Sequence, residues 1–200
     1  MKKKIKMAVL FVVITVLVFL YAHIDKNRYL YDTNTPSEDY VSTGVLLEGE
    51  LITQTFVCEE EILDGINLKS TIVGSAENVA LEYAVQDNGT NEIIGGTIQG
   101  TEIKNNKFNK YKFQRISGTK GREYTIILKA TGTDENNGIS FYVDPAENRQ
   151  DTLFIKDQKS QGTLVARTLS HRFDLETFIV LLGFVAFVTG FIKVLYKLFK

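Results

Sequence analysis

Side chains suited to nucleophilic or acid-base catalysis are scarce in this 200-residue sequence. Its histidines are His23 and His171, both beside hydrophobic segments near the ends of the chain, and its one cysteine is Cys58. No nucleophile and base stand at a recognisable spacing, and the sequence has no CxxC, HExxH or P-loop motif. We therefore predict a protein that is not an enzyme and that has no catalytic residues and no cofactor.

Two acidic runs, residues 59–61 and 134–137, offer oxygen ligands of the kind that calcium prefers. Neither run has the ligand spacing of an EF-hand loop. Solvated turns account for both runs, so we predict no metal site. A structural calcium ion in one of the runs stays an alternative.

Carbohydrate recognition combines exposed aromatic faces with amide or carboxylate groups, and this sequence has no tryptophan. Tyr142 is the best exposed aromatic candidate, because its neighbours Phe141 and Val143 alternate to the opposite face of a predicted strand. Lys129 and Glu123 occupy outward positions on another predicted strand. Tyr142, Lys129 and Glu123 are the predicted ligand-binding residues. The alternative for Tyr142 is an ordinary surface tyrosine that shields a sheet.

The elements that position these side chains are predicted strands. Residues 79–85, 123–130 and 139–143 alternate apolar and polar side chains, a pattern typical of strands with one buried face. Further strands are expected near residues 44–47, 50–58, 64–72, 92–99, 110–116, 151–156 and 162–167. Turn residues separate these runs, and no long helical pattern intervenes, which favours antiparallel pairing. The expected fold is an all-β antiparallel sandwich, a jelly roll, with Cys58 as a small buried hydrophobe.

Both ends of the chain are hydrophobic. Residues 7–24 and 175–195 correspond to helices of about 27 Å and about 31 Å, long enough to cross a bilayer. The predicted organisation is a basic N-terminus (1–6), a transmembrane helix (7–24), a linker (25–42), an extracytoplasmic β-sandwich domain (43–172), a second transmembrane helix (173–195) and a basic tail (196–200).

Lysines flank both hydrophobic segments on their outer sides: Lys2, Lys3, Lys4, Lys6, Lys193, Lys197 and Lys200. Because positive flanks are retained in the cytoplasm, we predict a protein of the cell membrane with both termini cytoplasmic and the middle domain extracytoplasmic. A cleaved signal peptide is the alternative for the first segment, although no A-x-A-like site follows it.

The charge of the middle of the chain argues against nucleic acid as a partner. Residues 23–172 hold 16 lysines and arginines against 22 aspartates and glutamates, a net charge of 16 minus 22, or −6. A nucleic-acid-binding domain is expected to be basic.

Small residues mark one face of the second hydrophobic segment. Gly183, Ala186 and Gly190 share a helical face, and Ala186 and Gly190 form a small-xxx-small pair. We predict helix packing at this face, against the first segment or against a partner membrane protein. Plain lipid exposure is the alternative.

Five short segments of the predicted domain resemble a known kind of module. They are QTF at 54–56, LDGINL at 63–68, LEY at 81–83, YKF at 111–113 and GREYTIIL at 121–128. Their order is similar to that in galactose-binding-like jelly-roll modules of bacterial membrane proteins associated with cell-surface polysaccharide and glycosyl transfer. The resemblance spans about residues 45–143 and consists of core positions. It implies an accessory or binding protein of the cell envelope whose β-domain recognises glycan or a partner protein, and whose spans fix it in the bilayer beside a membrane glycosyltransferase or another integral membrane protein.

Two other functional classes stay open. Polysaccharide chain-length regulators also have two spans around an outer domain, but they resemble α/β domains with a proline-rich stretch before the second span. Residues 168–174 contain no proline. An envelope enzyme would be distinguished by polar side chains converging in a pocket of the sandwich.

Overall fold

The computed structural model describes residues 2–146 and 152–199, with the side chains of residues 2–4, 7 and 8 left undescribed. The side chains of three predicted flanking lysines, Lys2, Lys3 and Lys4, therefore lie outside the described residues, as does all of Lys200. So does residue 151, where one predicted strand begins. The chain forms two compact units, Met1–Asp25 with His171–Lys200, and Lys26–Ser170.

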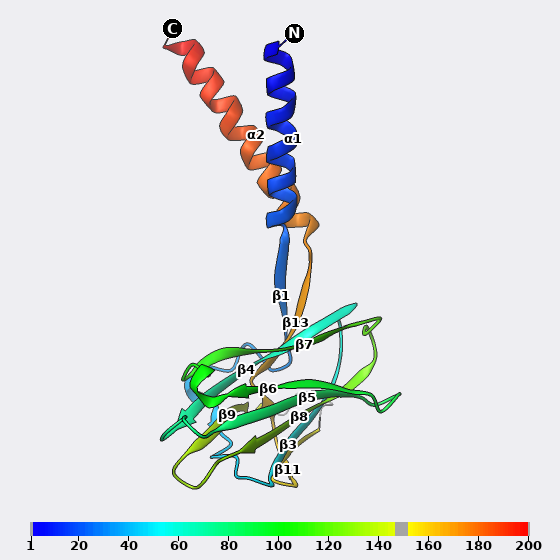
Figure 1. The fold of residues 1–200 in the computed structure, drawn as a ribbon, viewed down its shortest axis with the longest axis vertical. Helices are drawn as coiled ribbons and strands as arrows, with labels where there is room; N and C mark the ends of the chain where they lie inside the picture. The colour runs from blue at the N-terminus through cyan, green and yellow to red at the C-terminus, as the bar shows by residue number, and fades with distance from the viewer. Residues whose placement is uncertain (1, 147–151, 200) are drawn as a thin grey trace. The chain divides into compact units, whose positions relative to one another are not determined.

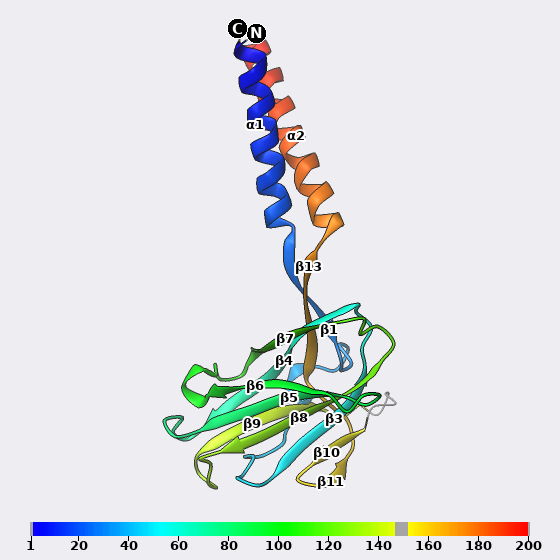
Figure 2. The ribbon, with the colours of Figure 1, turned by 45° about the vertical axis from the view of Figure 1, so that its right-hand side comes forward.

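The second unit is an antiparallel β-sandwich of two sheets, seen as two layers in Figures 1 and 2. The first sheet has the order β1 (His23–Tyr29), β13 (Ala166–Phe173), β4 (Ile62–Val73), β9 (Gly138–Asp144) and β12 (Thr163–Leu164), with β2 (Val41–Ser42) on β9 and β7 (Lys107–Ser117) on β4. The second has the order β11 (Gln158–Ser160), β10 (Leu153–Ile155), β3 (Leu51–Val57), β8 (Glu123–Thr131), β5 (Ala80–Asp87) and β6 (Ile93–Gln99). The predicted two-sheet antiparallel architecture is confirmed.

Alternation along the strands fills the space between the sheets with apolar side chains. On β8, Tyr124, Ile126, Leu128 and Ala130 are all fully buried. Each large side chain buried in this way contributes about 1.5 to 3 kcal/mol. Cys58 is also fully buried in this core, as predicted.

The long strand β4 organises the first sheet because three strands pair with it. One edge of β4 pairs with β7, while the other edge pairs first with β13 and then with β9. The change of partner falls at Lys69, whose backbone N–H donates to the carbonyl of Val165 at 2.9 Å. The N–H of Val165 in turn donates to the carbonyl of Tyr142 at 2.8 Å. Val165 thus joins β4 to β9 at the point where Lys69 and Tyr142 stand side by side.

The segment predicted as a linker, residues 25–42, differs from that prediction. It contains most of β1, the short 3-10 helix η1 (Ser37–Asp39) and β2. The N–H of Leu30 donates to the carbonyl of Ala166 at 3.0 Å, and Leu30 and Tyr31 are each only 5% exposed. The linker assignment was wrong. It was based on the polar composition of the segment, but the few apolar side chains in the segment pack against the first sheet.

Strand boundaries differ in further places: the predicted strand 162–167 is divided between β12 and β13, and β11 was not predicted. Residues 44–47 form no strand, and the short strand β2 precedes them instead. Leu46 is nevertheless fully buried, and its N–H donates to the carbonyl of Ile139 at 2.9 Å. A second 3-10 helix, η2 (Gly100–Glu102), connects β6 to β7.

The other unit contains two helices, α1 (Lys2–Tyr21) and α2 (Leu175–Leu198). Asp174 caps α2, since its carboxylate accepts a hydrogen bond from the N–H of Thr177 at 3.1 Å. Within the described residues, α2 is the one helix long and apolar enough to cross a membrane, and the apolar part of α1, Val9–Tyr21, is shorter. One of the two predicted spans is therefore supported by length and composition.

The packing of residues 26–42 predicts which fragment of the chain folds. A fragment of residues 26–170 should give a cooperative, β-type circular dichroism spectrum, whereas one of residues 43–170 should lose about 3 kcal/mol or more of unfolding free energy. The reason is the loss of buried Leu30 and Tyr31 from the first sheet. Urea denaturation of both fragments measures the difference. Equal stability would show that residues 26–42 are a tether after all.

Candidate ligand-binding face

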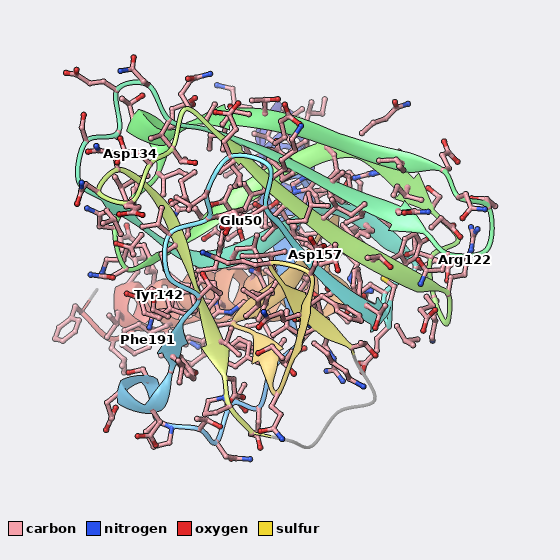
Figure 3. All side chains as sticks on the ribbon, turned by 90° about the horizontal axis from the view of Figure 1, so that it is seen from below. Glu50, Arg122, Asp134, Tyr142, Asp157 and Phe191 are labelled. Atoms are coloured by element: carbon pink, nitrogen blue, oxygen red, sulfur yellow. The ribbon has the colours of Figure 1, made fainter. Side chains whose placement is uncertain are left out.

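The outward face of the first sheet carries an aromatic and cationic group centred on Lys69. The ammonium nitrogen of Lys69 lies 4.9 Å from the ring centroid of Tyr40 and 5.0 Å from that of Tyr142. The hydroxyl of Tyr142, a residue labelled in Figure 3, donates to Oδ1 of Asn106 at 2.5 Å. We call Tyr40, Lys69, Asn106 and Tyr142 the Lys69 cluster. It combines two aromatic rings, an ammonium group and an amide in one place.

Backbone pairing explains why these residues meet. Lys69 of β4 lies opposite Phe108 of β7, and Tyr142 of β9 lies opposite Ser42 of β2. Tyr40 immediately precedes β2, so the chain from η1 brings its ring to the same face. Asn106 lies in the turn before β7 with a backbone φ of 57°, a left-handed conformation that asparagine tolerates better than most residues.

A second group, the Arg167 clamp, lies beside the Lys69 cluster and consists of Tyr29, Tyr31, Phe108 and Arg167. The guanidinium carbon of Arg167 lies 3.5 Å from the ring centroid of Phe108 and 4.5 Å from that of Tyr29. Its Nη2 donates to the hydroxyl of Tyr31 at 3.3 Å. Stacked cation–aromatic contacts of this kind contribute about 0.5 to 2 kcal/mol each. The clamp holds the chain around residues 29–31 against the sheet.

Tyr31 connects the two groups. Its ring centroid lies 5.5 Å from that of Tyr29 and 5.9 Å from that of Tyr40, both in edge-to-face arrangement. Burial, and then the neighbouring Tyr31 and Asp144, raise the pKa of Tyr40 to about 12. Tyr40 therefore keeps its proton at neutral pH, and Lys69 faces it as a neutral phenol.

The three ligand-binding residues predicted from the sequence do not lie together in the structure. Tyr142 lies on β9 of the first sheet, while Lys129 and Glu123 lie on β8 of the second, and the outward faces of the two sheets point apart. Nζ of Lys129 lies 3.6 Å from a carboxylate oxygen of Glu82, and Glu123 accepts a hydrogen bond from Asn88 at 2.7 Å. The three residues therefore cannot contact one small ligand together.

The other residues singled out in the sequence have local partners. The carboxylate of Asp134 accepts hydrogen bonds from the N–H groups of Asn136 and Asn137 at 2.8 and 2.9 Å, which closes its own turn. Nδ1 of His171 lies 2.8 Å from the carboxylate of Asp25. Among the described residues, no three histidine, cysteine, aspartate or glutamate side chains are grouped closely enough to hold a metal ion.

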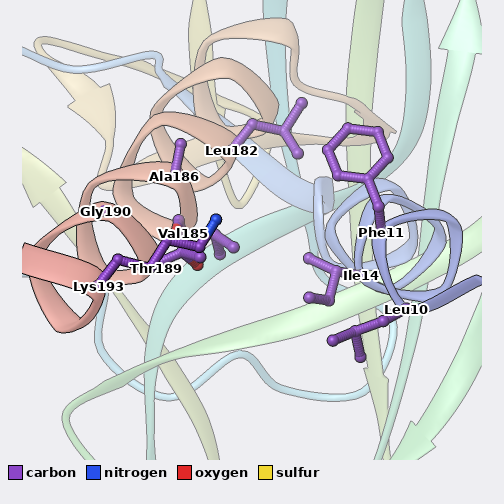
Figure 4. A pocket seen from close by; sticks show the side chains of 9 residues that line it. All are labelled: Leu10, Phe11, Ile14, Leu182, Val185, Ala186, Thr189, Gly190 and Lys193. Carbon is purple, nitrogen blue, oxygen red and sulfur yellow. The ribbon is translucent and has the colours of Figure 1, made fainter. Parts of the chain in front are cut away.

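The two helices of the other unit leave an apolar groove of about 450 Å³ between them (Figure 4). Ala186 and Gly190 line this groove together with residues of α1 such as Phe11, but Gly183 does not. A Cβ atom added at Gly183 or Gly190 would meet no atom within 4 Å. The predicted packing face is therefore not in close contact with α1 at its glycines, and contact with a partner helix or with lipid stays a prediction.

Comparison with known proteins gives no family assignment. No protein-family model matches the sequence, and no curated protein matches it. Matches exist among solved structures, where 28 chains are similar to this one.

Three of these structures illustrate the range. The protease and lectin-like domains of Cwp84, a surface layer associated protein of Clostridium difficile, match with 7% identity over 68% of this chain and 37% of that chain, at a TM-score of 0.43. The xylan-binding module CBM15 matches with 13% identity over 75% of this chain and 99% of that chain, at a TM-score of 0.38. The C-terminal domain of the sugar-binding protein EclA matches with 7% identity over 64% of this chain and 79% of that chain, at a TM-score of 0.24.

The chain thus spans less than two fifths of the Cwp84 chain, which is 37% covered. Because all three TM-scores are below 0.5, none of these structures assigns a ligand to this chain.

The two groups on the first sheet should respond differently to loss of charge. Arg167→Met should lower the unfolding free energy by about 1 to 2 kcal/mol, because it removes the stacked guanidinium from Phe108 and Tyr29. Lys69→Met should cost less than about 0.5 kcal/mol, since a thioether packs well against aromatic rings. Urea denaturation of the two variants tests this. Equal losses would make Lys69 part of the clamp.

Proposed function

We propose that this chain is a non-enzymatic binding protein of the bacterial cell envelope, whose β-domain binds glycan at the Lys69 cluster. The observation that carries the proposal is the contact of Lys69 with the rings of both Tyr40 and Tyr142, together with the hydrogen bond from Tyr142 to the amide of Asn106. Sugar rings present C–H groups that pack on aromatic faces and hydroxyls that bond to amide, phenol and ammonium groups. The cluster supplies all of these within one surface.

The burial of the cluster fits a binding surface. Tyr40, Lys69 and Tyr142 are each partly exposed, whereas Tyr31 beneath them is buried. The inner residues therefore hold the outer rings in place, and the outer rings keep accessible area for a ligand. A site whose geometry exists before binding loses less entropy when the ligand arrives.

The membrane assignments belong to the same proposal. We place α1 and α2 across the cell membrane, with both termini cytoplasmic and a jelly-roll domain outside, on the basis of the flanking lysines and the apolar helices. The resemblance to modules of polysaccharide-associated membrane proteins supports a role beside a membrane glycosyltransferase or in surface-polysaccharide assembly. The strand-rich unit lacks, in its described residues, the long helices of chain-length regulators, which makes that alternative less favoured.

Glycan binding is tested with the full chain in lipid nanodiscs and a panel of soluble bacterial polysaccharides. Tyr142→Ala should weaken binding by at least about tenfold, which corresponds to about 1.4 kcal/mol, because it removes one of the two rings. The matched control is Phe154→Ala, which deletes a ring that is 39% exposed on β10 of the other sheet. If no polysaccharide binds, or both variants weaken binding equally, the proposed function is wrong.

Membrane topology has its own test. The test uses a reporter enzyme whose activity depends on its compartment. Fused after Lys200, it should behave as cytoplasmic, and inserted at Asn88, it should behave as extracytoplasmic. The reason is retention of the lysine-rich flanks on the cytoplasmic side. Activity of both fusions in the same compartment would contradict two spans with the domain outside.

A further inference from the structure

We infer that the glycan bound at the Lys69 cluster is anionic and carries carboxylate or phosphate groups. The inference rests on the proposed function and adds the chemical class of the ligand. It starts from the cations around the cluster, in a domain whose residues 23–172 carry a net charge of −6.

Four cations share the outward face of the first sheet: Lys69, Lys110, Lys112 and Arg167. Phe108, Lys110 and Lys112 alternate along β7 with the buried residues Asn109 and Tyr111, so they point outward. Strand pairing places the cations in adjacent rows of this face: Lys112 opposite Gly65, Lys110 opposite Asn67, Asn67 opposite Arg167, and Phe108 opposite Lys69.

Strand geometry keeps these cations close together. Neighbouring strands lie about 4.8 Å apart, and outward residues along one strand repeat about every 6.8 Å. The four cations thus occupy a surface comparable in size to two or three sugar units. Residues 23–172 carry a net charge of −6, so these four cations lie together in a domain that is acidic as a whole.

Two carboxylates near this face, Asp64 and Asp144, have hydrogen-bond partners other than Lys69 and Lys112. Oδ1 of Asp64 accepts a hydrogen bond from Nε of Arg115 at 2.7 Å. Asp144 is 1% exposed and accepts the N–H of Asp32 at 2.9 Å. Within the described part of the chain, neither Lys69 nor Lys112 forms an ion pair with a carboxylate. In the described residues neither ammonium group is therefore neutralised by a carboxylate, although that of Lys69 also contacts two rings.

The arrangement favours an anionic sugar over an anionic lipid surface. Lys69 is half-buried between two rings, so it reaches a group that enters the cluster rather than a flat layer of headgroups. A ring stacked on Tyr142 would bring its carboxylate or phosphate to the ammonium group. Charge-assisted hydrogen bonds of that kind are about twice as strong as neutral ones.

The experiment compares acidic and neutral polysaccharides on the full chain in phosphatidylcholine nanodiscs. The panel contains polygalacturonate and hyaluronate as carboxylates, glycerol-phosphate teichoic acid as a phosphate polymer, and galactan and mannan as neutral chains. Acidic members should bind at least tenfold more tightly, and raising the salt concentration should weaken only their binding. Methyl-esterified polygalacturonate is the matched neutral form. The carboxylate and phosphate arms identify which anion is preferred.

Substitutions test whether Lys69 and Lys112 supply the positive charge that binds acidic glycan. Lys69→Met and Lys112→Met should each weaken acidic-glycan binding at least fivefold, and Lys69→Arg should restore most of it. Lys112 is exposed, so its variant stays informative if Lys69→Met disturbs the fold. Lys159→Met, on β11 of the other sheet, is the control and should leave binding unchanged.

The outcomes separate the two proposals. If neutral members bind as tightly as acidic ones, or if the lysine variants bind normally, the anionic inference is wrong while glycan binding stands. If no glycan binds, both proposals fail. Phosphatidylglycerol vesicles that bind through Lys69 in the absence of any glycan binding would make a lipid surface the ligand and overturn the inference.

Discussion

Hydrogen bonding along both edges of β4 sets the architecture of the first sheet. A buried strand must satisfy its N–H and C=O groups along its whole length, and β4 does so with β7 on one edge and with β13 and then β9 on the other. Val165 bonds to Lys69 and to Tyr142 at the point of exchange. Lys69 and Tyr142, the centre of the Lys69 cluster, are adjacent because of this exchange of strand partners.

The Arg167 clamp depends on the same sheet. Arg167 lies opposite Asn67 on β4, and its guanidinium reaches Phe108 on β7 and Tyr29 on β1. The clamp thereby holds the chain that carries Tyr40 to the outer face. Arg167 and Lys69 are both partly exposed, but the arginine is stacked on two rings and holds the chain, whereas the lysine is the residue to which we assign recognition in the proposed function.

Local periodicity in the sequence predicted the strands β5, β8 and β9, because alternation directly reports one buried face. It also identified Tyr142 as outward. It could not identify Lys69 or Tyr40 as its neighbours, since strand register between distant segments is not encoded in local alternation. Three tyrosines, Tyr29, Tyr31 and Tyr40, were the available signal in the supposed linker.

The order of the chain determines when the proposed ligand-binding face becomes complete. Its residues come from β4, β7 and β9 and from the segment before β2, but Val165 and Arg167, which join and clamp them, come near the end of the domain. Contacts between residues so far apart in sequence form slowly and late. A nascent chain that is released before residue 167 holds most of the hydrophobic core and yet lacks the finished face.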